Sequence, residues 1–148
     1  MTRLGIGGLE GPQTEVESAA QSYQDDLGWM VGVYGSGVWL IAGREVEALD
    51  MPRELATRAW NLLGQSVPVF ESSDEHGVRW AFITKVHVGP TLPELAVRGV
   101  DHIRSGRSID LPPSKYGQHH LRWITSPLTA TTPRFAVVAD AVLQALRG

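Results

Sequence analysis

The stretch Trp29–Ala42, with the sequence WMVGVYGSGVWLIA, decides the fold class of this chain. Trp29–Tyr34 and Val38–Ala42 are rich in β-branched and aromatic residues, which favour strands. Gly35-Ser36-Gly37 lies between them and is typical of a tight turn. The stretch therefore predicts an antiparallel β-hairpin.

A second hairpin is predicted further along the chain. Val67–Glu71 and Val78–Thr84 are again β-rich, and the turn-like segment Ser73–Gly77 joins them. Shorter runs of the same kind predict four more strands. These are Val46–Asp50, Val100–Ile103, Ser108–Leu111 and Leu121–Ile124.

Helical patterns lie before, between and after these strands. Thr14 is predicted to open the first helix, with Glu17 completing a capping box. Pro52 is expected at the start of the second helix, and Thr132 is expected to cap the last helix with Pro133 at its first position. Because strands and helices do not alternate strictly, the pattern predicts an α+β fold with a mostly antiparallel sheet flanked by helices.

The bulk composition is that of one ordinary globular domain. The chain has 148 residues; we expect residues 1–13 to form a flexible tail and residues 14–148 to form a single domain. The absence of cysteine excludes disulfides and thiolate metal sites, and it favours a cytoplasmic protein. No apolar run approaches the roughly 20 residues that cross a bilayer, so no membrane partner is expected.

The formal net charge of −3 argues against a protein whose whole surface binds nucleic acid. A local basic patch remains compatible with this charge, because several cationic residues fall in the second half of the chain. These residues are Arg79, Arg98, Arg104, Arg107, Lys115 and Arg122.

The five histidines do not form a recognisable metal motif. His119 and His120 are adjacent, and neighbours on a strand point to opposite faces. A zinc site would need ligands converging from distant segments. The simpler interpretation is that the histidines lie exposed on loops. No Gly-x-Ser-x-Gly elbow supports a serine nucleophile either.

The strand predicted at Val46–Asp50 carries acidic residues. Two-metal phosphoryl transfer needs carboxylates that converge on a pair of ions. Alternation places Ala48 with Asp50 on one face and Glu47 on the other, so a second acid beside Asp50 is missing. The alternative interpretation is that Asp50 simply leads into the helix beginning near Pro52.

The most specific pattern is GVDHIRSGRSIDLPPS, residues 99–114, followed by the predicted strand Leu121–Ile124. In it an aspartate is followed five residues later by glycine, then by a strand, then by Pro-Pro-Ser, and finally by a strand carrying tryptophan. This order resembles the C-terminal signature of bacterial prim-pol (primase/polymerase) domains of the archaeo-eukaryotic primase superfamily. The matching residues are Asp101, Gly106, Pro112, Pro113, Ser114 and Trp123.

Other segments resemble the family more loosely. Leu27-Gly28-Trp29 is similar to the start of its first strand, and Ala48-Leu49-Asp50 to its Asp-x-Asp strand. Gly77–Phe82 is similar to its second motif, with Arg79 where the family has histidine. The resemblance covers roughly residues 15–127 and is strongest with short actinobacterial proteins labelled bifunctional primase/polymerase.

The resemblance implies a degenerate active site. An active member uses three acids to hold two Mg²⁺ or Mn²⁺ ions and a histidine to contact nucleotide phosphates. By resemblance, Asp50 and Asp101 are the remaining catalytic and metal-binding residues, while Ala48 replaces the third acid and Arg79 the histidine. Glu47 would compensate only if a bulge turned it inward. We therefore expect little or no polymerase activity.

The basic residues near these motifs suit phosphate. Arg79, Arg104, Ser114 and Lys115 are the expected nucleotide- or nucleic-acid-binding residues, and we expect a basic groove where Asp50, Arg79, Asp101 and Lys115 converge. The alternative is that Pro-Pro-Ser is a rigid turn and Arg79 a solvated strand residue.

Three functions remain open on the sequence alone. The first is a non-catalytic prim-pol-like domain that binds DNA or nucleotide. The second is a regulatory scaffold that binds a protein partner, through an exposed apolar surface around Trp29 and Trp39. The third is an active, metal-dependent primase/polymerase.

Overall fold

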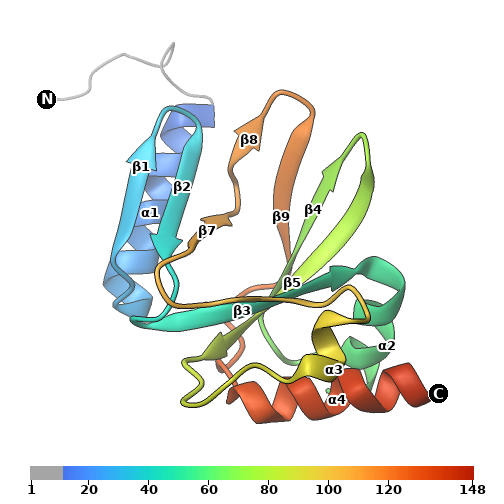
Figure 1. Cartoon of the computed structure of the whole chain (residues 1–148). Helices are drawn as coiled ribbons and strands as arrows, with labels where there is room; N and C mark the ends of the chain where they lie inside the picture. Colours follow the sequence, from blue (N-terminus) through green and yellow to red (C-terminus); the bar gives the residue numbers. More distant parts are fainter. Residues whose placement is uncertain (1–11) are drawn as a thin grey trace, which may run out of the picture.

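The structure is a computed structural model that describes the backbone of residues 12–148 and the side chains from residue 14 onward. Figure 1 shows helices packed against two antiparallel sheets, which confirms the predicted α+β class. In chain order the elements are α1 (Pro12–Leu27), β1 (Val31–Tyr34), β2 (Gly37–Ile41), β3 (Val46–Pro52), α2 (Arg53–Leu62), β4 (Val69–Asp74), β5 (Gly77–Lys85), α3 (Pro93–Ala96), β6 (Asp101–Ile103), β7 (Ser108–Leu111), β8 (Lys115–Tyr116), β9 (His119–Thr125) and α4 (Phe135–Arg147).

A large six-stranded sheet has the order β6-β3-β5-β4-β9-β8, and every pair of neighbours is antiparallel. Strand β3 is paired on both sides, with β5 from Val46↔Lys85 to Pro52↔Arg79 and with β6 at three positions. Its first four residues are buried on alternating faces, and three of them, Val46, Ala48 and Leu49, are apolar, so the strand is covered on both sides.

One face of the large sheet is covered by α2 and α4, which pack against each other beneath it (Figure 1). Leu49, Met51 and Phe82 point from the sheet into this layer and are fully buried. The helices supply a stripe of small and aliphatic residues at helical spacing, including Ala56, Ala59, Val138 and Val142.

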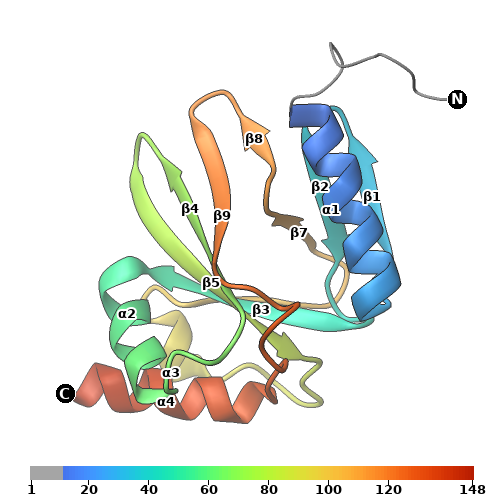
Figure 2. The same cartoon turned by 180° about the vertical axis from the view of Figure 1, so that it is seen from behind.

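The opposite face is partly covered by α1 and a small sheet of order β1-β2-β7. Figure 2 shows α1 running along β1 and β2 on one face of this small sheet. Val38 and Leu40 of β2 pack with Ala48 and Phe70 of the large sheet in this second core. Beyond this cover, the C-terminal end of β3 and the adjoining part of β5 carry polar side chains.

A buried polar contact joins α1 to the segment that follows β7. The hydroxyl of Tyr23 donates to the carbonyl of Pro112, and the indole Nε1 of Trp123 donates to the Tyr23 oxygen over 2.9 Å. Tyr23 is almost fully buried, and burial raises the pKa of its phenol to about 12. The phenol therefore remains a neutral donor at any ordinary pH.

Both predicted hairpins are confirmed, with shifted ends. The first turn is Gly35-Ser36, and the second is shorter than predicted because β4 continues to Asp74 and β5 starts at Gly77. The two-residue strand β8 was not predicted. It is too short to show a sequence period, and it forms because it pairs with β9.

Two predicted helix starts are wrong. The first helix begins at Pro12, so Thr14 lies inside α1 instead of capping it. The predicted tail, residues 1–13, falls outside the described residues except for Pro12 and Gln13, which already belong to α1. The last helix begins at Phe135, because the carbonyl of Pro133 accepts from the backbone N–H of Lys85 and is held outside the helix.

The predicted apolar surface around Trp29 is also wrong for Trp29 itself. Its indole stacks on Tyr23 with ring centroids 5.5 Å apart and is buried in the second core. Within the described residues, no helix combines the length and the apolar character that crossing a bilayer would require.

Replacing Tyr23 with phenylalanine is expected to lower the free energy of unfolding by about 1–3 kcal/mol, because the buried carbonyl of Pro112 and the partly buried indole N–H of Trp123 both lose their partner. Urea denaturation monitored by circular dichroism measures the change. Tyr34→Phe is the matched control, since Tyr34 is 85% exposed and should show no shift. Equal stability of Tyr23→Phe and the unmodified protein would contradict the assignment of this hydroxyl to structure.

Candidate functional site

Asp50 and Asp101 lie directly opposite each other on β3 and β6. Both side chains belong to the face of the large sheet that α1 and the small sheet leave partly open, because Asp50 alternates with the buried Ala48 of the second core. Register partners of an antiparallel pair lie roughly 5 Å apart. The structure thus brings together the two acids that the prim-pol resemblance implies for a metal site.

Each acid is already paired with an arginine. Arg79 of β5 reaches Asp50, with Nε 3.1 Å from Oδ2, and its Nη2 donates to the carbonyls of Asp50 and Gly99. Arg107, in the segment between β6 and β7, forms a bidentate pair with Asp101 in which both N···O distances are 2.8 Å. Two guanidinium groups therefore stand beside the carboxylates that would face metal ions.

The pKa values of the two carboxyl groups are shifted in opposite directions by their surroundings. Burial is the largest influence on Asp50 and raises its pKa, although the positive charge of Arg79 opposes this. The hydrogen bonds from Arg107 lower the pKa of Asp101, which is more exposed. Asp101 is therefore the more firmly ionised of the two acids.

The donor set does not fit a two-metal centre. Ala48, at the position of the missing acid, is fully buried under the small sheet. Within residues 12–148 no group of three histidine, aspartate or glutamate side chains is arranged to hold an ion. Two carboxylates that are each bound to a guanidinium offer little to Mg²⁺ or Mn²⁺, which prefer several free oxygen ligands.

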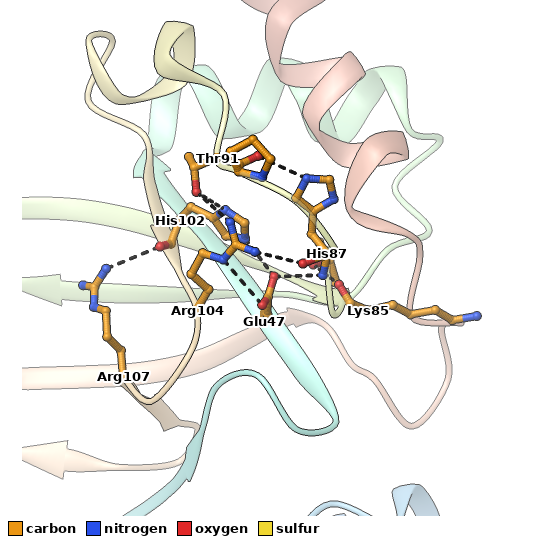
Figure 3. Close-up of polar contacts among 9 residues, drawn as sticks. Glu47, Lys85, His87, Thr91, His102, Arg104 and Arg107 are labelled. Atoms are coloured by element: carbon orange, nitrogen blue, oxygen red, sulfur yellow. Dashed lines mark hydrogen bonds and ion pairs between the residues drawn. The ribbon is translucent and has the colours of Figure 1, made fainter.

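Glu47 lies on the other side of the sheet, so no bulge turns it toward Asp50. Its side chain is only 1% exposed, and Oε1 accepts from the backbone N–H of His87 at 3.0 Å and pairs with Nε2 of His102 at 2.9 Å (Figure 3). Its other oxygen, Oε2, lies 3.8 Å from Nε of Arg104 and has no hydrogen bond among the described residues.

Arg104 belongs to this second cluster and not to the Asp50–Asp101 pair. Nη2 donates to the carbonyl of His87 at 2.9 Å and Nη1 to the hydroxyl of Thr91 at 3.2 Å (Figure 3). Together with Glu47, these contacts fasten the segment after β5 to the edge of the sheet. The expected phosphate-binding role of Arg104 would require these contacts to break.

His102 corrects the expectation that all histidines are exposed on loops. It lies on β6, its side chain is buried, and its ring stacks on Phe135 of α4 with centroids 4.5 Å apart. Its Nδ1 lies 2.8 Å from the Thr91 hydroxyl, so both ring nitrogens have partners. Burial lowers the pKa of His102 despite the neighbouring Glu47, which indicates a neutral ring at neutral pH.

Ser114 and Lys115 lie at the junction of the two sheets. The hydroxyl of Ser114 is fully buried, accepts from the backbone N–H of Val38 at 2.9 Å and lies 2.6 Å from the carbonyl of Leu111. Lys115 is exposed on β8, at the edge of the sheet opposite β6. Asp50, Arg79 and Asp101 therefore converge as expected, and Lys115 lies apart from them.

Sequence reasoning missed two features of the site. The first is the pairing of Arg107 with Asp101, since Arg107 was expected only as a member of a basic patch. A tight turn at Ser105-Gly106 reverses the chain and brings the Arg107 side chain to Asp101. The second feature is a pocket of about 610 Å³ beside Arg79, formed where α2 begins under the β4–β5 hairpin. Its lining residues are Pro52, Arg53, Glu54, Ser72, Asp74, His76, Gly77, Val78 and Arg79.

The sequence and the structure were compared with known protein families, curated proteins and solved structures. No protein-family model matches the chain, and neither the curated proteins nor the solved structures contain a significant match.

Manganese is expected to leave the melting temperature of the unmodified protein unchanged, because both acids are occupied by arginines. Removing the arginines in the double variant Arg79→Ala/Arg107→Ala should free them, so that millimolar Mn²⁺ raises its melting temperature by roughly 1–2 °C. Differential scanning fluorimetry with and without the ion measures the shift. Adding Asp101→Asn should abolish it. A Mn²⁺ shift in the unmodified protein that disappears in Asp101→Asn would contradict this picture.

Acid is expected to destabilise the protein through His102. Since the folded state lowers the pKa of His102 from 6.5, the unfolded chain binds more protons below that pH, and the free energy of unfolding falls as pH falls. His102→Gln keeps a neutral donor and acceptor and should show a shallower decline between neutral pH and about pH 5. Urea titrations over this range measure both slopes, and identical slopes would refute the role of His102.

Proposed function

We propose that this chain is a non-catalytic domain that binds the phosphates of a nucleotide or nucleic acid at the Asp50–Asp101 site. The observation that carries the proposal is the placement of Arg79 and Arg107 on the two acids of a prim-pol-like pattern. In an active enzyme metal ions would connect such acids to phosphate. A guanidinium is the side chain best suited to take over the contact with phosphate.

Both arginines retain access to a ligand. Their side chains are 42% and 53% exposed, respectively. In the part of the chain that the structure describes, Nη1 of Arg79 and Nε of Arg107 make no hydrogen bond, so each guanidinium keeps a free donor. The acids hold the guanidinium planes in place, which reduces the entropy lost when an anion binds.

The adjoining pocket provides room for the ligand. Arg53 and Arg79 line it together with His76, and the first turn of α2 has no capping side chain on its backbone N–H groups. Helix N-termini favour anions, and α2 is a ten-residue helix. Glu54 and Asp74 also line the pocket, so its charge is mixed and favours a small number of phosphates over a long duplex backbone.

Polymerase chemistry fits this site poorly. Charge that develops on a transferred phosphoryl group needs metal ions held by several carboxylates. Here Ala48 replaces one acid, and Glu47 is committed to His87 and His102 on the opposite side of the sheet. The site therefore supports binding better than catalysis.

A protein-binding scaffold is the second candidate function. It is favoured by exposed apolar residues on the first hairpin, where Tyr34 is 85% and Ile41 is 38% exposed. The net charge of −3 also suits a protein partner better than an extended nucleic acid.

Fluorescence anisotropy with labelled ATP, single-stranded DNA and duplex DNA tests the proposal, at low and moderate salt and with and without Mn²⁺. We expect binding that weakens with salt, because phosphate contacts release counterions. Arg79→Ala should weaken it by about tenfold, the loss expected for one charge-assisted contact. Manganese should not change the affinity.

Arg147→Ala is the matched control, because it removes the same charge from an exposed position at the end of α4. An equal loss in both variants would show a nonspecific charge effect. Absence of salt-sensitive binding to any of the three ligands would overturn the proposal and favour the protein scaffold. Metal-dependent incorporation of labelled nucleotide, lost in Asp101→Ala, would show an active enzyme.

A further inference from the structure

On the face of the β1–β2 hairpin that points away from α1, aromatic rings pack directly over glycine residues. Trp39 of β2 lies over Gly32 of β1, its register partner. A Cβ at position 32 would lie only 2.5 Å from Cζ2 of the indole, closer than real carbon atoms approach. Glycine at this strand position therefore lets the Trp39 ring lie against the backbone, where it remains partly exposed.

A second glycine has the same role beside Tyr116. A Cβ at Gly37 would overlap the hydroxyl of Tyr116, which comes from β8. Tyr34 is the register partner of Gly37, so it points to the same side of the hairpin and is 85% exposed. Trp39, Tyr34 and Tyr116 thus share one face, which we call the aromatic face.

The aromatic face is continuous with the polar part of the large sheet. The Tyr116 ring makes an edge contact with His119, and Nε2 of His119 lies 2.8 Å from the hydroxyl of Ser72, a residue of the Arg79 pocket. Lys115, next to Tyr116, is exposed and adds a positive charge. A ligand that occupies the arginine site can therefore extend toward the aromatic rings.

Resting on the proposed function, we infer that the aromatic face stacks the bases of single-stranded nucleic acid whose phosphates reach the arginine site. Flat aromatic side chains beside scattered cations are the usual composition of such surfaces, because every base offers a π-face. Asp110 lies opposite Trp39 on β7 and is exposed. Its negative charge disfavours a phosphate there and leaves the position to an uncharged base.

The ring chemistry favours a single strand over the other occupants. In a duplex the bases are stacked on one another and cannot lie on a side chain without being extruded. A protein partner would bury Tyr34 equally well against aliphatic groups, and a leucine at position 34 would then serve as well as an aromatic ring.

Substitutions at Tyr34 separate these cases, since this exposed residue can change without unfolding the domain. Tyr34→Leu removes the ring and keeps apolar area, whereas Tyr34→Phe keeps the ring. We expect Tyr34→Leu to weaken anisotropy-detected binding of oligothymidylate by about fivefold or more, with Tyr34→Phe nearly unchanged. Binding of duplex DNA and of ATP should be unaffected. Val137→Ser, on α4, is the control for removing an exposed apolar side chain.

Three results would overturn the inference alone. If Arg79→Ala weakens binding and Tyr34→Leu does not, the arginine site stands and the aromatic face has no role in it. If duplex and single strand lose equal affinity in Tyr34→Leu, base stacking is refuted. If Tyr34→Leu changes only the oligomeric state measured by sedimentation, the face is an interface between copies. Absence of binding to ATP and to DNA alike would overturn the proposed function together with the inference.

Discussion

The burial of β3 on both faces is the constraint on which the rest of the molecule depends. Consecutive side chains of a strand point to opposite sides, so the strand sorts its acids into two separate environments. Glu47 enters the layer of α2 and α4, and Asp50 enters the partly open face with Asp101. Moving Glu47 to the other side would turn Leu49 and Met51 out of the helix layer as well, which the core does not permit.

Because the acids lie on two different faces of the sheet, their negative charges are compensated by two different sets of partners. Glu47 is buried and draws three partners from the segments around it, namely the backbone N–H of His87, the ring of His102 and the guanidinium of Arg104. Asp50 and Asp101 are less buried, and Arg79 and Arg107 neutralise them at the surface. A buried carboxylate without such partners would cost several kcal/mol. The same two arginines are the groups on which the proposed phosphate site relies.

Local sequence patterns were sufficient for the two hairpins and the α+β class, whereas the pairing of Asp50 with Asp101 was expected only from the prim-pol resemblance. They were not sufficient wherever the decisive partner is distant in sequence. Nothing near His102 indicates that Phe135, 33 residues later, covers its ring. The burial of Ser114 depends on Val38 in the other sheet, and the start of α4 depends on the N–H of Lys85. The helix ends and the buried polar residues were therefore the parts least open to prediction.

Strand β8 has a mechanical consequence that its length of two residues does not suggest. The backbone N–H of Lys115 donates to the carbonyl of Ser36 at the tip of the first hairpin, and the Ser36 hydroxyl donates back to the carbonyl of Lys115 over 2.7 Å. At the same time β8 pairs with β9 of the large sheet. These hydrogen bonds connect the tip of the first hairpin, through β8, to strand β9 of the large sheet. The hairpin therefore cannot move away from the large sheet unless they break. These contacts limit opening and closing between the two sheets, so that the first hairpin and the large sheet move as one stiff body.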